Sequence, residues 1–228
     1  MLFTGKVMIF RNGDDNRLWD PSDGSLSTLP LFGYNTFCDG HVTTADGRVF
    51  FAGGHVRNFE GLSNASLYDP ISNTYSNVPN MIAGRWYPST VALANGDVLA
   101  LSGDVEPGTR NLIPEVWDFS QDAWRVLTDA SLEVPRYPAS FLAPNGQVFV
   151  ATRISRYLDT SGKGQWSTVD NHQDSIEWHL DKHILGCFSR LVLVSWSCHE
   201  SVVFGSSFAD ARLRAFWPIG DDILGDDL

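Results

Sequence analysis

The stretch DGRVFFAGGHVRNFEGLSNASLYDPISNTY (46–75) contains every feature that decides the fold. It begins with an Asp-Gly pair, which is preferred in two-residue hairpin turns because the central residues there take positive φ. An apolar strand follows, then a loop, then an aromatic strand that ends at Asp69, a residue type whose carboxylate binds backbone N–H groups of a turn. The stretch therefore predicts short antiparallel strands joined by tight turns.

The same design occurs four times along the 228 residues of the chain. The glycines of the first turn are Gly5, Gly47, Gly96 and Gly146, at spacings of 42, 49 and 50 residues. The aromatic residues before the second turn are Trp19, Tyr68, Trp117 and Tyr157, at spacings of 49, 49 and 40 residues. A unit of about 50 residues with four short strands is typical of a kelch-type propeller blade. Because the turn glycines and the aromatic residues both recur along the chain, the pattern favours such blades over a β-sandwich with regular turns.

We therefore predict an all-β partial β-propeller, with three complete blades plus part of a fourth, over residues 1–170. The apolar strands at 49–54, 98–103 and 148–151 are expected on the side of each blade nearest the propeller axis. From residue 171 to residue 228 the pattern stops, and no domain is predicted there.

The tail 171–228 carries a group of potential metal-binding side chains. His179, His183 and Cys187 are four residues apart and would share one face of a helix. Their spacing matches no familiar zinc module, so no metal ligand is predicted in the tail. A truncated gene, an unspliced intron or a shifted frame would each produce such an interruption of the repeat.

Composition excludes several classes of function. The net charge of −11 argues against nucleic acid and against an anionic membrane surface, because both require a basic face. No apolar run reaches the length of a membrane span, and the N-terminal residues do not have the pattern of a signal peptide. Three cysteines are too few for a disulfide scaffold, and the odd number leaves at least one thiol for another use.

Four motifs carry a resemblance to a known family. They are FCDGH (37–41), AGGH (52–55), SLYDPISNTY (66–75) and AGRWYPS (83–89). In order and spacing they resemble consecutive motifs of the galactose oxidase/glyoxal oxidase propeller family, and the similarity runs from about residue 3 to about residue 170. The resemblance implies extracellular copper-radical oxidases that oxidise an alcohol or aldehyde and reduce O2 to H2O2. It also implies seven blades, which would require roughly 340 residues.

The resemblance assigns roles to two residues. Cys38 and Tyr87 match the pair that the family joins through a thioether, whose tyrosine holds a radical and serves as a copper ligand. Their separation of 49 residues is one repeat, so they are expected at equivalent positions on adjacent blades. The other family ligands are a Tyr-His dipeptide and a later His, and no Tyr-His dipeptide occurs in this sequence. We therefore expect the chain to be inactive alone.

Other interpretations of the same residues stay open. Tyr137 follows Tyr87 by 50 residues, so the aromatic side chain at this position can be part of the repeat core. Cys38 can be a small buried hydrophobic residue, and His41 and His55 favour structural or solvated roles over metal binding. The alternative function is a non-catalytic kelch propeller that binds a protein or carbohydrate through its loops. The oxidase interpretation implies a small alcohol, an aldehyde or a carbohydrate as substrate.

Overall fold

The computed structural model describes residues 1–10, 16–171, 187–188, 191–192 and 201–202. Within these residues the chain is all-β, apart from one short 3-10 turn, η1 (Thr128–Ala130). The strands form four sheets of four strands each and three two-stranded hairpins. No helix in the described part of the chain is long and apolar enough to cross a membrane.

Each four-stranded sheet is antiparallel, and its strands follow chain order except at the N-terminus. The first sheet contains β1 (Val7–Phe10), β2 (Arg17–Trp19) and β3 (Leu26–Thr28), with β22 (Ser201–Val202) paired to β1. The second contains β4 (Gly40–Thr43), β5 (Val49–Ala52), β8 (Ala65–Asp69) and β9 (Thr74–Val78). The third contains β10 (Ser89–Ala92), β11 (Val98–Leu101), β14 (Glu115–Asp118) and β15 (Ala123–Val126). The fourth contains β16 (Ala139–Leu142), β17 (Val148–Ala151), β18 (Ile154–Asp159) and β19 (Gln165–Asn171).

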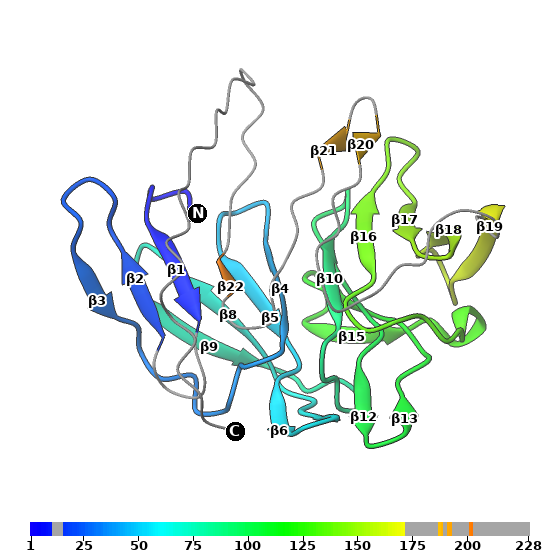
Figure 1. Cartoon of the computed structure of the whole chain (residues 1–228), viewed down its shortest axis with the longest axis horizontal. Helices are drawn as coiled ribbons and strands as arrows, with labels where there is room; N and C mark the ends of the chain where they lie inside the picture. The colour runs from blue at the N-terminus through cyan, green and yellow to red at the C-terminus, as the bar shows by residue number, and fades with distance from the viewer. Residues whose placement is uncertain (11–15, 172–186, 189–190, 193–200, 203–228) are drawn as a thin grey trace, which may run out of the picture.

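The small hairpins lie in the loops between strands. They are β6 (His55–Arg57) with β7 (Glu60–Gly61), β12 (Asp104–Glu106) with β13 (Thr109–Arg110), and β20 (Cys187–Phe188) with β21 (Leu191–Val192). In Figure 1 the four sheets follow one another across the molecule, and β6, β12 and β13 lie together at its lower side. The prediction of three complete blades plus part of a fourth is confirmed, and the N-terminal blade is the one with three strands from the repeat region.

The expected position of the apolar strands is wrong by one place. The strands that contact one another between neighbouring blades are β4, β10 and β16, the first strands of their sheets. The close approach is shown by Gly40, where an added Cβ would lie 3.0 Å from the backbone oxygen of Pro88. The apolar strands β5, β11 and β17 are therefore second from the axis. They are apolar because neighbouring blades cover them on their two faces, which makes β5 and β11 buried at every position.

Apolar clusters fill the spaces between neighbouring blades. Phe50 of β5 is completely buried, and its ring centroid lies 6.0 Å from that of Trp117 in the third blade. Leu99 of β11 belongs to a cluster that includes Val148 and Leu158 of the fourth blade. These contacts pack each blade against the next.

The turn after each aromatic strand has the predicted aspartate chemistry. In all four blades an Oδ1 atom accepts a hydrogen bond from the backbone N–H two residues later, at 2.8–3.0 Å; the four residues are Asp20, Asp69, Asp118 and Asp159. Hydrogen bonds from the turn lower the pKa of these carboxyl groups below the ordinary value of 3.8.

These turns make the free energy of unfolding depend on pH in the acid range. Because the native pKa is lower than the unfolded one, the stabilisation is complete above pH 3.8 and is lost as the pH falls through the native pKa. We expect a variant with the four aspartates changed to Asn to show a shallower loss of stability below that pH. Asn forms the same turn, so stability at pH 7 serves as the control. Parallel acid-unfolding curves for the two proteins would contradict this expectation.

Candidate active site

Three equivalent positions form a ladder between the blades. Cys38, Tyr87 and Tyr137 each lie two residues before an innermost strand, and all three have left-handed backbones, with φ of 63°, 63° and 43°. The Tyr87 N–H donates to the carbonyl of Cys38 at 2.9 Å, and the Tyr137 N–H donates to the carbonyl of Tyr87 at 2.9 Å. Successive blades are thus joined directly, residue to equivalent residue.

The ladder places the backbones of Cys38 and Tyr87 next to each other. The hydrogen bond shows that their one-repeat separation brings them to neighbouring blades, and Cys38 is buried while Tyr87 is half-buried. Neither residue lies within a strand, because both occupy the loops that lead into β4 and β10. A side-chain encounter between the thiol and the phenol stays a prediction.

An aromatic stack surrounds the Tyr87 ring. Its centroid lies 4.0 Å from that of Trp86 and 4.6 Å from that of Tyr137. The phenol of Tyr137 donates a hydrogen bond to the backbone carbonyl of Asp39 at 2.9 Å, which links the fourth blade to the second. Tyr137 is thus both a repeat residue and a direct neighbour of the candidate radical tyrosine.

His55, at the start of β6, accepts a hydrogen bond from the Trp86 indole. The indole Nε1–H donates to His55 Nδ1 at 2.9 Å, so the imidazole carries its proton on Nε2. Burial lowers the pKa of His55, which keeps the ring neutral and able to accept this bond. His41 lies on β4, where its Nδ1 is 3.0 Å from Asp39 Oδ1.

A buried ion pair fixes the segment that leads to Tyr87. Arg85 is completely buried, and its guanidinium donates to Glu115 Oε1 at 2.8 Å and to the carbonyls of Ser102 and Ile113 at 2.8 and 2.7 Å. The second oxygen of Glu115 accepts the N–H of Ile82 at 2.9 Å. Desolvation lowers the pKa of Arg85 from its ordinary value, but the carboxylate opposite supports its charge. Sequence reasoning missed this pair, since its members are 30 residues apart.

Glycines allow neighbouring loops to close on this segment. A Cβ at Gly53 would lie 2.4 Å from the Arg85 carbonyl oxygen, and one at Gly61 would lie 2.1 Å from the Arg85 carbonyl carbon. Gly103, from the next blade, is also close, since a Cβ there would lie 2.9 Å from Arg85 Cβ. Gly53 of the AGGH motif therefore has a structural reason: only a residue without a side chain fits there against the backbone of the segment that leads to Tyr87.

Asp39 adds a buried carboxyl group beside Cys38. Burial raises its pKa above the ordinary value, and the contact with His41 opposes that shift. Among the described residues its Oδ2 atom has no hydrogen-bond partner. The sequence signal for this residue was its place within FCDGH, which by itself does not separate a turn aspartate from a buried one.

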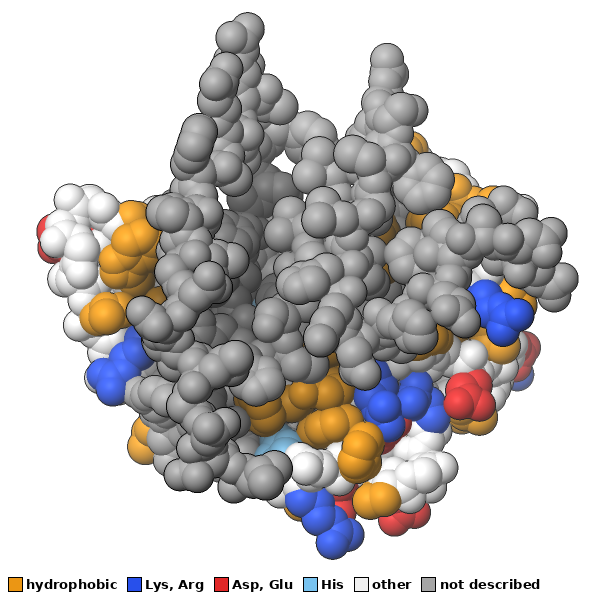
Figure 2. All heavy atoms as spheres, in the orientation of Figure 1, with side chains coloured by type: hydrophobic (Ala, Val, Ile, Leu, Met, Phe, Trp, Pro, Cys, Tyr) orange, Lys and Arg blue, Asp and Glu red, His pale blue; other side chains and the backbone are white. Residues whose placement is uncertain are grey.

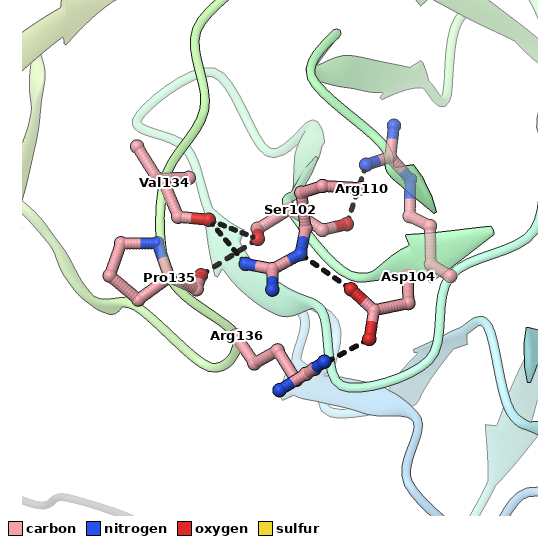
Figure 3. Close-up of polar contacts among 7 residues, drawn as sticks. Ser102, Asp104, Arg110, Val134, Pro135 and Arg136 are labelled. Atoms are coloured by element: carbon pink, nitrogen blue, oxygen red, sulfur yellow. Dashed lines mark hydrogen bonds and ion pairs between the residues drawn. The ribbon is translucent and has the colours of Figure 1, made fainter. Parts of the chain in front are cut away.

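A second charged cluster lies on the same side of the sheets. Asp104 is buried and accepts hydrogen bonds from Arg110 Nε and Arg136 Nε, both at 2.5 Å (Figure 3). The Arg136 guanidinium also lies over the rings of Phe59 and Trp86. Figure 2 shows hydrophobic side chains directly beside Lys and Arg side chains on the lower part of the visible face.

The described donors do not make a complete copper site. Within the described ranges, no three His, Cys, Asp or Glu side chains are grouped so that they can hold a metal ion. Tetragonal copper requires several nitrogen and oxygen ligands, and the resemblance supplies only one of them in this part of the chain, Tyr87. His179 and His183 lie outside the described residues, and of Cys187 only the backbone is described.

Comparison with known proteins gives two kinds of relative. Galactose oxidase of Gibberella zeae is 28% identical over 116 residues, which is 50% of this chain and 16% of the relative. An F-box/kelch-repeat protein of Arabidopsis thaliana is 35% identical over 108 residues, which is 46% of this chain and 21% of the relative. No protein-family model matches the chain.

A solved structure confirms the architecture. A fungal alcohol oxidase of the AA5 family, solved in complex with copper, matches 75% of this chain and 36% of its own with a TM-score of 0.58 and 21% identity. The chain thus has the galactose oxidase-type β-propeller fold, and it resembles galactose oxidase-like kelch proteins over part of its length. It spans less than a quarter of the curated relatives that it matches.

Proposed function

Starting from these galactose oxidase-like blades, we propose that the chain is part of a copper-radical oxidase and supplies its cysteine–tyrosine cofactor from Cys38 and Tyr87. The enzyme would be extracellular and would oxidise a small alcohol, an aldehyde or a carbohydrate with O2, giving H2O2. Copper would bind at Tyr87, and its other ligands would come from outside the described residues. The chain alone is expected to give no peroxide.

The hydrogen bond from the Tyr87 N–H to the Cys38 carbonyl is the observation that carries the proposal. It supports a pairing that the sequence motifs indicate independently. The surroundings also suit a radical tyrosine. The ring is stacked against Trp86 and Tyr137 at centroid distances of 4.0 and 4.6 Å, and the segment before it is held by the buried Arg85.

The cross-link has a definite chemical balance. Cys38 Sγ forms a bond to a ring carbon of Tyr87, and the thiol hydrogen and one ring hydrogen leave as two protons and two electrons. O2 takes up both and becomes H2O2. The resulting thioether donates electron density to the ring, so the modified tyrosine is easier to oxidise than an ordinary one. When copper is bound, the metal and the radical each accept one electron.

A non-catalytic kelch propeller is the second candidate function. The observation that favours it is the match to an F-box/kelch-repeat protein, whose identity of 35% exceeds the 28% of the galactose oxidase. In that case Tyr87 and Tyr137 would be core residues of the ladder, and the loops would bind a protein or carbohydrate. The state of Cys38 separates the two candidates.

The test is to treat the full chain with Cu(II) and O2 and to analyse a tryptic digest by mass spectrometry. Peptides 18–48 and 86–110, which contain Cys38 and Tyr87, are expected as one species lighter by two hydrogens than their sum. Cys38→Ser and Tyr87→Phe are each expected to abolish it.

Tyr87→Cys provides a test of proximity that needs no copper. Because the two backbones are hydrogen-bonded, a disulfide between residues 38 and 87 is expected under mild oxidation. A disulfide without any thioether in the wild type would favour the binding propeller. Absence of both bonds would contradict the proposed pair.

A further inference from the structure

We infer that Asn145, in the turn between β16 and β17, is a spontaneous modification site, where the side-chain amide is converted through a succinimide to aspartate and isoaspartate (Figure 1). The equivalent residue of the third blade, Asn95, is also followed by a glycine but is protected by its contacts. A third Asn-Gly pair, Asn12–Gly13, lies outside the described residues. The inference depends neither on copper nor on the proposed cross-link.

The reaction is favoured where a glycine follows the asparagine, because no Cβ shields the attacking backbone nitrogen. The nitrogen of Gly146 loses its proton to water and forms a bond to Cγ of Asn145. The bond from Cγ to Nδ2 breaks, and ammonia leaves. Water then opens the succinimide ring at either carbonyl, which gives aspartate or isoaspartate. In total one water molecule is taken up and one ammonia is released, with no oxidation or reduction.

Each turn must open before the glycine nitrogen can attack. The Gly146 N–H donates to the Ala143 carbonyl at 2.9 Å, and the Gly96 N–H donates to the Leu93 carbonyl at 3.0 Å. While these bonds are in place, neither nitrogen can reach the neighbouring amide. The rate at each site therefore follows how often its turn opens, which depends on side-chain contacts and burial.

Neutral contacts at the surface hold the side chain of Asn145. Its Nδ2 donates to Gln147 Oε1 at 3.1 Å, and its Oδ1 accepts the Gln147 N–H at 3.1 Å. Asn145 and Gly146 are both exposed. Hydrogen bonds between neutral groups in water contribute little net stability, so this turn opens readily.

A buried carboxylate holds the equivalent turn of the third blade. Asn95 Nδ2 donates to Asp97 Oδ2 at 2.6 Å, which is a charge-assisted bond. Asp97 is buried, and its Oδ1 accepts the N–H of Phe119, the residue after β14, at 3.3 Å. The strand that follows the turn is also better covered, since β11 is buried at every position and β17 only at Val148 and Val150. The turn at Asn95 therefore opens less often.

The two products differ in their effect on the hairpin. Asp46 occupies the equivalent position in the second blade, where its Oδ1 accepts the Arg48 N–H at 3.2 Å, so aspartate is compatible with this turn. Isoaspartate adds one carbon atom to the main chain after Asn145, within the loop that pairs Leu142 with Val148. Isoaspartate therefore disturbs the pairing of β16 with β17, whereas aspartate preserves it.

The experiment ages the folded, copper-free chain in mildly alkaline buffer and follows tryptic peptides 137–153 and 86–110 by mass spectrometry. Conversion makes a peptide heavier by the difference between a hydroxyl and an amino group, and labelling by an isoaspartyl methyltransferase identifies isoaspartate. We expect conversion of Asn145 to be about fivefold or more faster than that of Asn95, because hydrogen bonds to charged groups are the stronger ones. Asn145→Ser is expected to abolish the change in peptide 137–153.

Gln147→Asp tests the cause of the difference. It gives Asn145 the carboxylate partner that Asn95 has and is expected to slow conversion of Asn145, while the rate at Asn95 in the same sample stays unchanged. In urea, where both turns are open, the two rates are expected to converge. Four outcomes would each overturn the inference: no conversion of Asn145, conversion of Asn95 at least as fast, an unchanged rate in Gln147→Asp, or an undiminished difference in urea.

Discussion

Replacing Arg85 with methionine is expected to lower the free energy of unfolding by about 3–5 kcal/mol. The substitution leaves Glu115, which is 1% exposed, as a buried charge without its partner. It also removes the donors to the carbonyls of Ser102 and Ile113. The loss is measured by urea unfolding at pH 7, as a shift in midpoint at unchanged slope.

Two further variants show that the buried pair causes this loss. Arg85→Met combined with Glu115→Leu removes both charges and is expected to recover part of the stability, giving a coupling energy between the two sites. Arg57→Ala breaks an exposed pair and is expected to change stability by about 0–1 kcal/mol. A loss in Arg85→Met no larger than in Arg57→Ala would contradict the role of this pair.

Gly61→Ala is expected to be the second most disruptive change, with a loss of about 3 kcal/mol or more. The added Cβ would lie 2.1 Å from the Arg85 carbonyl carbon and 2.2 Å from the Trp86 backbone nitrogen. These are backbone atoms, so relief requires the segment before Tyr87 to move. We therefore expect Gly61→Ala to prevent formation of the proposed Cys38–Tyr87 thioether as well as to lower the stability.

Gly108→Ala separates the steric effect from the conformational one. Gly108 lies at the turn of the equivalent hairpin, with φ of 83° and no atom within 4 Å of an added Cβ. Alanine there is expected to cost about 1–2 kcal/mol through the left-handed backbone alone. Thermal unfolding of both variants is the measurement. A smaller loss in Gly61→Ala than in Gly108→Ala would show that the loops around Arg85 are not tightly packed.

The repeat and its turns could be predicted because their chemistry is local. Asp69 and its three equivalents accept hydrogen bonds from residues two positions later, which a short motif specifies. The innermost strands were missed since sequences such as GHVT (40–43) and STVA (89–92) mix polar and small residues. Each of these strands is the first of its sheet and pairs with a neighbouring strand of that sheet on one edge only. Most of their positions are half-buried, so their sequences contain no continuous apolar run.

The sequence could predict those residues of the candidate site whose spacing follows the repeat, but not the others. Cys38 and Tyr87 are one repeat apart, and that spacing is enough to place them on adjacent blades. Arg85 and Glu115, like Arg136 and Asp104, meet across separations of 30 and 32 residues that follow no repeat. Their pairing depends on which loops the blades bring together. A single sequence contains no local signal for such a contact.

The ladder of left-handed residues has a consequence for how this fold can be altered. The hydrogen bonds that join Cys38, Tyr87 and Tyr137 use backbone atoms, so any side chain that tolerates a left-handed backbone can occupy these positions without removing them. A thiol and two phenols already occupy equivalent rungs. The side chains that face one another between the blades can therefore differ from blade to blade, while the same backbone hydrogen bonds hold the innermost strands in order.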